Sequence, residues 1–450
     1  MSDYKPFIFK INSANGSVFK KIEQSKKDII FSKIVSYPLA SLGFQCFLHR
    51  TKNAMDITNN LETTNKFYYV VNPFEHKIND YKEDLNSEAK KFFDIEKEEP
   101  NILSRAFYKM WEMILYFDLA SKKDMTYAAL AEGPGSFLQA VLKYREKYGH
   151  DLKKDKYFGV TIHPENGKNI EMGKQFMGYY DKKYPEVLNI QKTYSKDKSK
   201  NYKSRSNGDI TEVKTISLFK KDIQKSKNYA DLVTADGGFD WNDENYQEQE
   251  AYQLILGEIV AALRVQNKDG NFVLKLFETF TITSLKMIYI LTSFYEDSYF
   301  CKPLFSRESN SEKYIICKGF KYDQKKDKDK LEEKISKLES ILEKMSSNEF
   351  VQDIFEDLEL PIDFRNNIRY ANIEIANKQQ VMINKIVVYI KENNYYGDKY
   401  HQYREKQIDA SKWWIKNFLT EKVNKSFEKI SNEVISFNSQ EEKQFSNKLV

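Results

Sequence analysis

Two charged residues stand at runs of the sequence that are otherwise apolar. Asp236 directly follows the run LVTA, and Lys275 lies inside the run NFVLKLF. Each run predicts a buried strand, and a charge at the carboxyl end of a buried parallel strand points into the crevice where open α/β sheets bind ligands. Because unpaired buried charge is costly, we expect Asp236 and Lys275 to face each other across that crevice. Taken alone, the two residues fit a structural ion pair at a strand end equally well.

A glycine turn forms a second candidate site. The stretch MTYAALAEGPGSFLQAVLKY predicts an apolar strand, a turn and a helix that begins near Ser136. Gly133 and Gly135 allow close backbone approach to a ligand, and Ser136 is the expected N-cap. The turn differs from the GxGxxG of dinucleotide enzymes and lacks the GK[ST] of a P-loop. It indicates a nucleotide-type turn, with a plain strand-to-helix turn as the alternative.

Two more polar residues are ambiguous by themselves. Lys109 lies in SRAFYKMWEMILYF, which predicts a helix whose apolar stripe includes Phe107 and Trp111. Lys109 lies off that stripe, so without further context an ordinary solvated lysine is the favoured interpretation. Asp209 lies in the turn NGDIT, where its carboxylate either accepts hydrogen bonds from an adenine amino group or ribose hydroxyls, or caps the next helix.

The elements that must position these residues alternate between strand and helix. Apolar strands are expected at KYFGVTIHP, around Asp236 and Lys275, at SYFCKP and at EKYIICKGF, with helices at 252–265 and about 284–295. Such alternation predicts a doubly wound α/β fold with a parallel sheet. We expect an N-terminal accessory segment at 1–83, a catalytic domain at 84–321 and a helical C-terminal region at 322–450. The latter opens with an apolar seam, Leu331 to Met345, that predicts a helix packed on a neighbour.

The charge of the chain is nearly balanced but unevenly placed. There are 71 Lys and Arg against 66 Asp and Glu, a net charge of +5, and much of the excess lies in the basic stretch, Lys192 to Arg205. This stretch is either a loop that follows RNA phosphates, with Tyr194 and Tyr202 stacking on bases, or a solvated insertion. The three cysteines are too few and scattered for a disulfide framework or a thiolate metal site. With no signal sequence and no long apolar run, we expect a soluble intracellular protein.

Four motifs in order resemble the FtsJ-like RNA 2′-O-methyltransferases, closest to the cap-methylating forms of large cytoplasmic DNA viruses. They are SRAFYKMWE, AEGPGSF, TADGGFD followed by GNFVLKLF, and KPLFSRESNSEKYII, within about residues 101 to 320. The resemblance implies a Rossmann-like methyltransferase sheet, mostly parallel with an antiparallel last strand. It also implies a catalytic tetrad of Lys109, Asp236, Lys275 and Glu312, which overrides the solvated interpretation of Lys109. The second strand departs from the pattern, since TIHP leaves His163 and Glu165 doubtful as ribose contacts.

The resemblance further implies a cofactor, a substrate and partners. S-adenosylmethionine would be the cofactor, with no metal. The residues expected to bind it are Glu132, Gly133, Pro134, Gly135, Ser136, Phe137, Asp209 and Asp236. The implied substrate is the ribose 2′-hydroxyl of the first transcribed nucleotide of capped mRNA; ribosomal RNA and a non-catalytic RNA-binding or scaffold subunit are the alternatives. The implied location is the cytoplasm, which would be the host cytoplasm for a viral protein, with packaging in the virion as a further possibility. The implied partner is the capping or transcription machinery, and no membrane is involved.

The tetrad has a definite expected chemistry. A lysine is a poor base at neutral pH, so we expect burial and Lys109 to lower the pKa of Lys275 toward roughly 8, which suits general-base catalysis. Asp236 and Lys109 would orient the reacting groups, and Glu312 would support Lys275. A cap pocket needs aromatic side chains, for which Phe280 and the N-terminal tyrosines are candidates.

Overall fold

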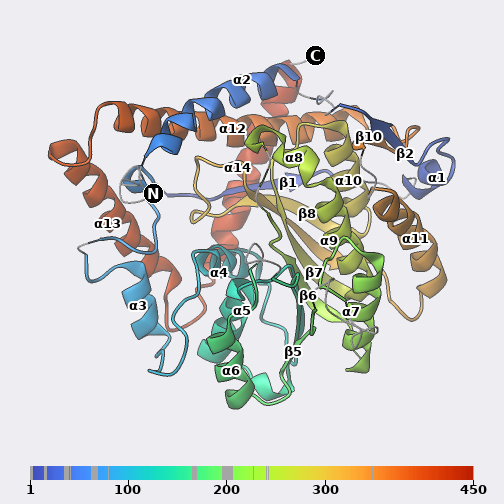
Figure 1. Cartoon of the computed structure of the whole chain (residues 1–450), viewed down its shortest axis with the longest axis horizontal. Helices are drawn as coiled ribbons and strands as arrows, with labels where there is room; N and C mark the ends of the chain where they lie inside the picture. The colour runs from blue at the N-terminus through green and yellow to red at the C-terminus, as the bar shows by residue number, and fades with distance from the viewer. Residues whose placement is uncertain are drawn as a thin grey trace.

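An eight-stranded sheet lies at the centre of the part of the protein that the structure describes (Figure 1). The computed structural model describes residues 4–14, 18–34, 40, 42–61, 69–79, 81–164, 170–194, 206–226, 228–239, 241, 243–345 and 349–448. In spatial order the strands are β1 (Phe7–Ile11), β8 (Tyr295–Lys302), β9 (Lys313–Phe320), β7 (Gln266–Leu276), β6 (Ala230–Ala235), β3 (Thr126–Leu130), β4 (Lys156–Val160) and β5 (Leu188–Ile190).

Most of this sheet is parallel, as expected. Strands β5, β4, β3, β6 and β7 pair in parallel, whereas β9 is antiparallel to both β7 and β8. The antiparallel last strand of the predicted domain is therefore confirmed. At the far edge β1 pairs antiparallel with β8, so the stretch KPFIFKI, which the sequence predicts to be extended, joins the sheet, a pairing that the sequence did not predict.

Alternate residues of the central strands enter two different hydrophobic cores, because successive side chains of a strand point to opposite faces. On β7, Phe272 and Leu274 enter the first core and Val273 enters the second. The first core is covered by α7 (Val213–Lys225), α9 (Tyr252–Val265) and α10 (Ile282–Thr292). The second is covered by α4 (Ala106–Phe117), α5 (Ser136–Lys147) and α6 (Lys174–Lys183). The helix expected at 252–265 is thus confirmed as α9.

The segments outside the predicted catalytic domain pack onto it. Near the N-terminus lie α1 (Val18–Glu23), β2 (Ile29–Ser32), α2 (Leu42–Asn53) and α3 (Leu85–Phe92). After the domain come α11 (Lys328–Lys344), β10 (Phe350–Ile354), α12 (Ile362–Lys391), α13 (Asp398–Phe418) and α14 (Ser426–Lys448). Short helical turns are η1 (Ala54–Asn60), η3 (Leu152–Lys154), η4 (Glu244–Tyr246) and α8 (Gln247–Glu250).

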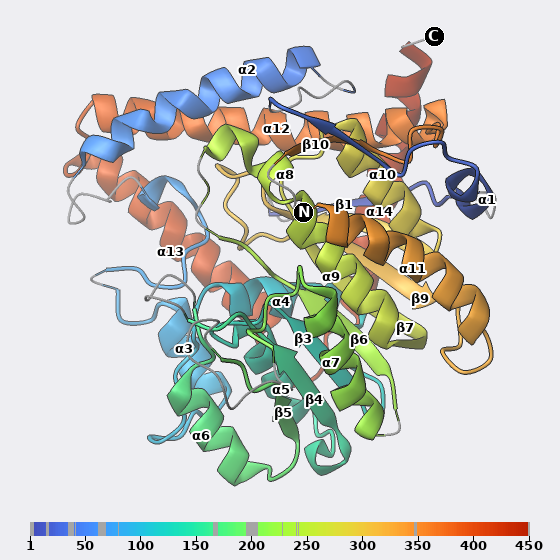
Figure 2. The same cartoon turned by 45° about the vertical axis from the view of Figure 1, so that its right-hand side comes forward.

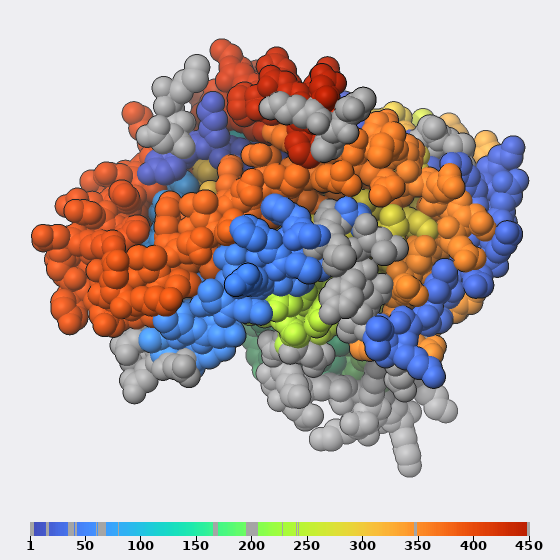
Figure 3. Space-filling view, turned by 90° about the horizontal axis from the view of Figure 1, so that it is seen from above, coloured from blue at the N-terminus to red at the C-terminus, as the bar shows by residue number. Residues whose placement is uncertain are grey.

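Contacts between the two ends of the chain are extensive. Helix α2 lies along α12 in both cartoon views (Figures 1 and 2), and the blue α2 borders the orange α12 in the space-filling view from above (Figure 3). The predicted helical C-terminal region is confirmed, and it also contains one strand, β10, which pairs with β2. Helix α11 packs on α9 through its apolar seam, as predicted. The boundaries at 83 and 321 remain our proposal.

A search of the described residues finds no helix that is both long and apolar enough to cross a bilayer.

Candidate active site

Asp236 and Lys275 meet at the carboxyl ends of two neighbouring parallel strands. Asp236 follows the last residue of β6, Ala235, which pairs with Leu274 of β7. The Lys275 Nζ lies 3.3 Å from Asp236 Oδ1 and donates to the Asp236 carbonyl oxygen at 2.9 Å. The two side chains are 12% and 18% exposed, so both remain accessible from solvent. Our expectation that these residues face each other is confirmed.

A second ion pair joins α4 to the start of β9. The Lys109 Nζ lies 2.7 Å and 2.9 Å from the two carboxylate oxygens of Glu312. Helix α4 is buried on every side from Phe107 to Phe117, and Lys109 itself is buried. The solvated interpretation of Lys109 was therefore wrong. Glu312 contacts Lys109 directly. Its expected support of Lys275 is therefore a longer-range attraction between opposite charges.

The two pairs share one face of the sheet because of strand periodicity. Lys275 lies two residues beyond Val273, whose side chain enters the core beneath α4, and Glu312 precedes Tyr314 by two residues on the same face. Tyr314 pairs with Lys275 in register and donates its hydroxyl to Asp236 Oδ1 at 3.0 Å. The side chains of Asp236, Lys275 and Glu312 therefore face α4, the helix that carries Lys109. Tyr314 was missed, although its spacing from Glu312 could have indicated it.

The charges around Lys275 set its protonation. Burial lowers the pKa of Lys275, but the carboxylates of Asp236, Glu312 and Glu258 outweigh burial and leave it raised above its ordinary value. This corrects our expectation of a lowered pKa. Lys109, which was expected to repel the Lys275 charge, is held by Glu312 instead. Burial would raise the pKa of Glu312, but Lys109 and Lys275 hold it well below its usual range.

A buried carboxyl group lies behind the pair and was not predicted. Glu258 of α9 is fully buried, and its Oε1 accepts from the Gly237 amide at 3.1 Å. Burial raises the pKa of Glu258 to about 8, against the lowering effect of Lys275. The single acid in the apolar run LILGEIVAAL was the available signal.

The loop that carries Glu312 is fixed from several sides. Ser306 donates to Glu312 Oε1 at 2.8 Å. The buried Lys302 donates to the Glu312 carbonyl oxygen at 2.6 Å, and burial lowers the pKa of Lys302 to about 7. Three residues after Lys109 on α4, Glu112 accepts from the amides of Leu304 and Phe305 at 2.7 and 3.1 Å. The same helix therefore positions the loop and pairs with its carboxylate.

The glycine turn lies at the carboxyl end of β3, next to the tetrad. Gly135, with φ of 114°, is the N-cap of α5, and Ser136 is the first helical residue. This corrects the expected N-cap, since the Ser136 hydroxyl instead pairs with the Ser104 hydroxyl at 2.8 Å. A side chain at Gly133 would lie 2.0 Å from the Ile170 carbonyl oxygen, so that position accepts only glycine.

The remaining residues of the turn are tied to the site. Glu132 is buried, accepts from the Leu138 amide at 2.8 Å and has its pKa raised to about 8 by burial. Pro134 accepts from the Gly173 amide through its carbonyl oxygen. The ring of Phe137 lies 5.9 Å from that of Tyr314, which connects the turn to Asp236. Both glycines of the turn let the segment from Ile170 to Phe176 approach it closely, since a Cβ at Gly135 would lie 3.2 Å from Met172.

Asp209 is brought to the neighbouring strand end. Its Oδ1 accepts from the Thr211 amide and hydroxyl at 3.0 and 2.7 Å, whereas Glu212 is the N-cap of α7. The helix-capping alternative is therefore wrong. The His163 amide donates to the carbonyl oxygen of Asn207 at 2.6 Å, which anchors this turn beside the end of β4. Glu165 lies outside the described residues.

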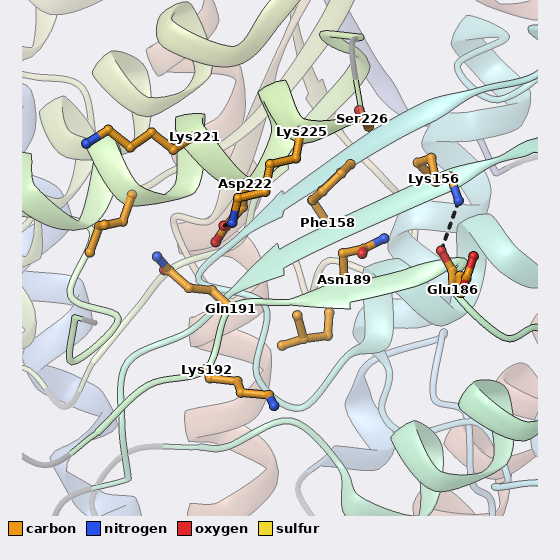
Figure 4. A pocket seen from close by; sticks show the side chains of 12 residues that line it. Lys156, Phe158, Glu186, Asn189, Gln191, Lys192, Lys221, Asp222, Lys225 and Ser226 are labelled. Carbon is orange, nitrogen blue, oxygen red and sulfur yellow. Dashed lines mark hydrogen bonds and ion pairs between the residues drawn. The ribbon is translucent and has the colours of Figure 1, made fainter. Parts of the chain in front are cut away.

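Two other predicted features do not join the site. Phe280 is only 2% exposed and packs against Phe44 and Leu48 of α2, so it cannot stack on a cap guanine. Residues 195–205 of the basic stretch, including Tyr202, lie outside the described residues. Lys192, where the stretch begins, lines a cavity of about 850 Å³ between β5 and α7 (Figure 4). That cavity shares no lining residue with the tetrad.

Comparison with known proteins agrees with this geometry. Residues 102–320 match the family model described as FtsJ-like methyltransferase. The chain is 30% identical over 218 residues to cap-specific mRNA (nucleoside-2′-O-)-methyltransferase 1 of Trypanosoma cruzi (strain CL Brener), covering 47% of this chain and 52% of that protein. It is 28% identical over 263 residues to the methyltransferase 2 of Drosophila melanogaster, covering 58% and 35%. With methyltransferase 1 of Mus musculus the identity is 30% over 243 residues, covering 49% and 26%.

The chain therefore spans about half the length of the trypanosome relative and less of the other two. The family match falls on the strands and helices that carry the glycine turn and both ion pairs, from α4 to β9. Over residues 102–320, just under half of its length, this chain is similar to the FtsJ-like methyltransferases.

Proposed function

We propose that this protein transfers the methyl group of S-adenosylmethionine to the ribose 2′-hydroxyl of the first transcribed nucleotide of capped mRNA. The observation that carries the proposal is the paired arrangement of Lys275 with Asp236 and Lys109 with Glu312 at one edge of the sheet, beside the glycine turn. The names of the relatives, which specify cap 2′-O-methylation, support the substrate.

The residues of the site act by positioning and proton transfer. When bound, the cofactor supplies an activated methyl group, so the protein must align and deprotonate a hydroxyl that is a poor nucleophile. Lys275 is the proposed base because the other lysine, Lys109, is held by both carboxylate oxygens of Glu312, whereas Lys275 lies 3.3 Å from a single oxygen of the Asp236 carboxylate. Asp236 and Tyr314 fix its position, and Lys109 with Glu312 orients the ribose. Because the pKa of Lys275 is raised, only a small neutral fraction is available at pH 7, and the rate rises with pH.

The glycine turn is the proposed cofactor site. Gly135→Val should weaken S-adenosylmethionine binding by at least tenfold in calorimetric titration, because a β-branched side chain would contact Met172 and Phe176 and block the backbone. Gly149→Val is the matched control, since Gly149 also has a positive φ, of 77°, but has open space around it. Equal affinities in the two folded variants would contradict a cofactor role for the turn.

The substrate is tested by methyl transfer to RNAs that differ in one feature. We expect transfer to a capped RNA, and none when its first nucleotide is 2′-deoxy. Transfer to ribosomal RNA in place of capped RNA would favour the ribosomal alternative. RNA binding without transfer to any substrate would favour the scaffold alternative.

The setting of the protein remains a prediction. We keep the kinship with viral enzymes, the cytoplasmic or virion location and the capping or transcription partners as proposals that rest on the motifs alone. The relatives named above come from a trypanosome, a fly and a mouse. If the protein is packaged, it would be recovered with the purified virion, and mass spectrometry would detect it there.

A further inference from the structure

Three aromatic rings contact one another in series beside Lys275, at interplanar angles of 48° and 76°. We call Phe239, Trp241 and Phe277 the aromatic platform. The ring centroids of Phe239 and Trp241 are 4.3 Å apart, and those of Trp241 and Phe277 are 4.7 Å apart. Phe239 is 46% exposed, whereas Trp241 and Phe277 pack partly against the first core. The platform therefore has two inner rings that pack on the core and one exposed outer ring, Phe239.

Both ends of the platform adjoin the proposed base. Phe277 follows Lys275 by two residues, and the Lys275 Nζ lies 5.7 Å from the centre of the Phe277 ring. Phe239 follows Gly238, where an added Cβ would lie 3.3 Å from the Lys275 Nζ. A ribose held by Lys275 would therefore place its own base within reach of these rings.

Contacts on both sides fix the backbone at Phe277, one end of the platform. The Lys313 ammonium donates to the Phe277 carbonyl oxygen. The next residue, Glu278, is buried and binds His49 at 2.8 Å and Lys52 at 3.0 Å, both from α2. An ordered surface loses little conformational entropy when a planar ligand binds to it. One exposed phenylalanine needs no explanation, but three rings in contact beside a charged catalytic candidate are typical of a base-stacking surface.

We propose that the aromatic platform stacks on the nucleobase of the nucleotide that is methylated, an inference that rests on the proposed RNA substrate. Stacking on an aromatic face is tolerant of sequence because every base has such a face. The platform would hold any of the four bases and turn the attached ribose toward Lys275. The N-terminal helix α2 would act indirectly, by fixing the backbone of Phe277.

The test is a double-mutant cycle with the full chain and capped RNA. One variant is Phe239→Ala, and the matched substrate carries an abasic first nucleotide with its ribose intact. Alanine substitution of a stacking residue is worth about 1–3 kcal/mol, so Phe239→Ala should raise KM for intact RNA by about 5- to 150-fold. The same variant should leave KM for the abasic RNA nearly unchanged. Phe239→Tyr should restore binding, and the affinity for S-adenosylmethionine should not change.

Phe437→Ala is the control, because Phe437 is a phenylalanine 61% exposed on α14, outside the region of family similarity. If Phe239→Ala behaves like Phe437→Ala, or weakens intact and abasic RNA equally, the platform does not bind the target base. Direct RNA binding separates this result from a failure of the proposed function. If the wild type transfers no methyl group but binds intact RNA more tightly than Phe239→Ala does, the role of the platform is supported and the proposed activity is not.

Discussion

Two ion pairs at opposite ends of the parallel strands differ in how many of their polar atoms have hydrogen-bond partners within the protein. At the amino end of β4, Asp155 binds Arg145 and also accepts from the Met125 amide at 2.8 Å and the Tyr157 hydroxyl at 2.9 Å. Arg145 further donates to the carbonyl oxygens of Ala120 and Lys122. The side chains are 1% and 0% exposed.

The pair at the carboxyl ends is more open. Among the described residues, Lys275 donates only to atoms of Asp236, and both side chains remain partly exposed. Partial exposure distinguishes this pair from the fully buried one, but exposure alone is not a sufficient criterion of function, because exposed ion pairs are common on protein surfaces. Unused hydrogen-bonding capacity that faces solvent is the better one, because a substrate needs a donor or acceptor that the fold has not already satisfied.

Removing the proposed base should have the largest effect on activity. Lys275→Met should reduce single-turnover methyl transfer by about 10²- to 10⁴-fold, the usual contribution of a general base. Calorimetric affinity for S-adenosylmethionine should stay within a few fold, because Lys275 acts on the hydroxyl. If the variant keeps more than about a tenth of wild-type turnover, another group is the base.

Breaking the buried Arg145–Asp155 pair should lower stability and leave activity nearly unchanged. Arg145→Met leaves the buried Asp155 without its cation and should lower the free energy of unfolding by about 3–5 kcal/mol in urea titration. Methyl transfer per folded molecule should remain near that of the wild type at low temperature. A folded Arg145→Met variant with transfer as weak as that of Lys275→Met would remove the distinction between the two pairs.

A smaller effect concerns pH. Asp236→Asn removes a carboxylate that raises the pKa of Lys275, so that pKa should decrease. The base acts in its neutral form, and the rise of kcat with pH should therefore level off at lower pH than in the wild type, with a lower plateau. Rates measured from pH 6 to 10 test this. Asp231→Asn, at the start of the same strand, should leave the profile unshifted, and an unshifted profile in Asp236→Asn would contradict our assignment of Lys275.

The smallest effect is expected at the basic stretch, where each lysine would contribute one phosphate contact. Each lost phosphate contact should reduce the slope of log affinity against log salt by roughly 0.7 for single-stranded RNA. The variant replaces four lysines by glutamine: Lys196, Lys198, Lys200 and Lys203. The control makes the same charge change around the start of α11: Lys325, Lys326, Lys328 and Lys330. Binding curves of the two variants that overlay at every salt concentration would leave the stretch as a solvated insertion.

The sequence predicted best where one strong periodicity dominates a segment. The uniformly apolar runs before Asp236 and within 252–265 became β6 and α9, because their burial on all sides admits few alternatives. The pairing of β1 and the existence of β10 were missed, since each strand is five residues long and gains its partner only from distant parts of the chain. Short mixed segments carry no local signal for such pairing.

Within the site, residue identity was predictable and electrostatics was not. The motifs indicated the four charged residues that the fold brings together. The direction of the Lys275 pKa shift depended instead on which carboxylate contacts which lysine, and on Glu258, which approaches from a helix behind the sheet. Those distances are set by tertiary packing, so spacing along the chain does not contain them.

The edge strand β1 contacts a part of the chain that is synthesised much later. Strand β1 pairs with β8, and the Asn438 amide of α14 donates to the Ile8 carbonyl oxygen, a contact that spans 430 residues of sequence. At ribosomal rates of about 5–20 residues per second, roughly 20 to 90 s separate the synthesis of these two partners. The domain that carries the tetrad is complete well before then. Until α14 has been synthesised, the outer edge of β1 lacks this contact, and an exposed strand edge is the surface that a chaperone would have to shield from pairing with another chain.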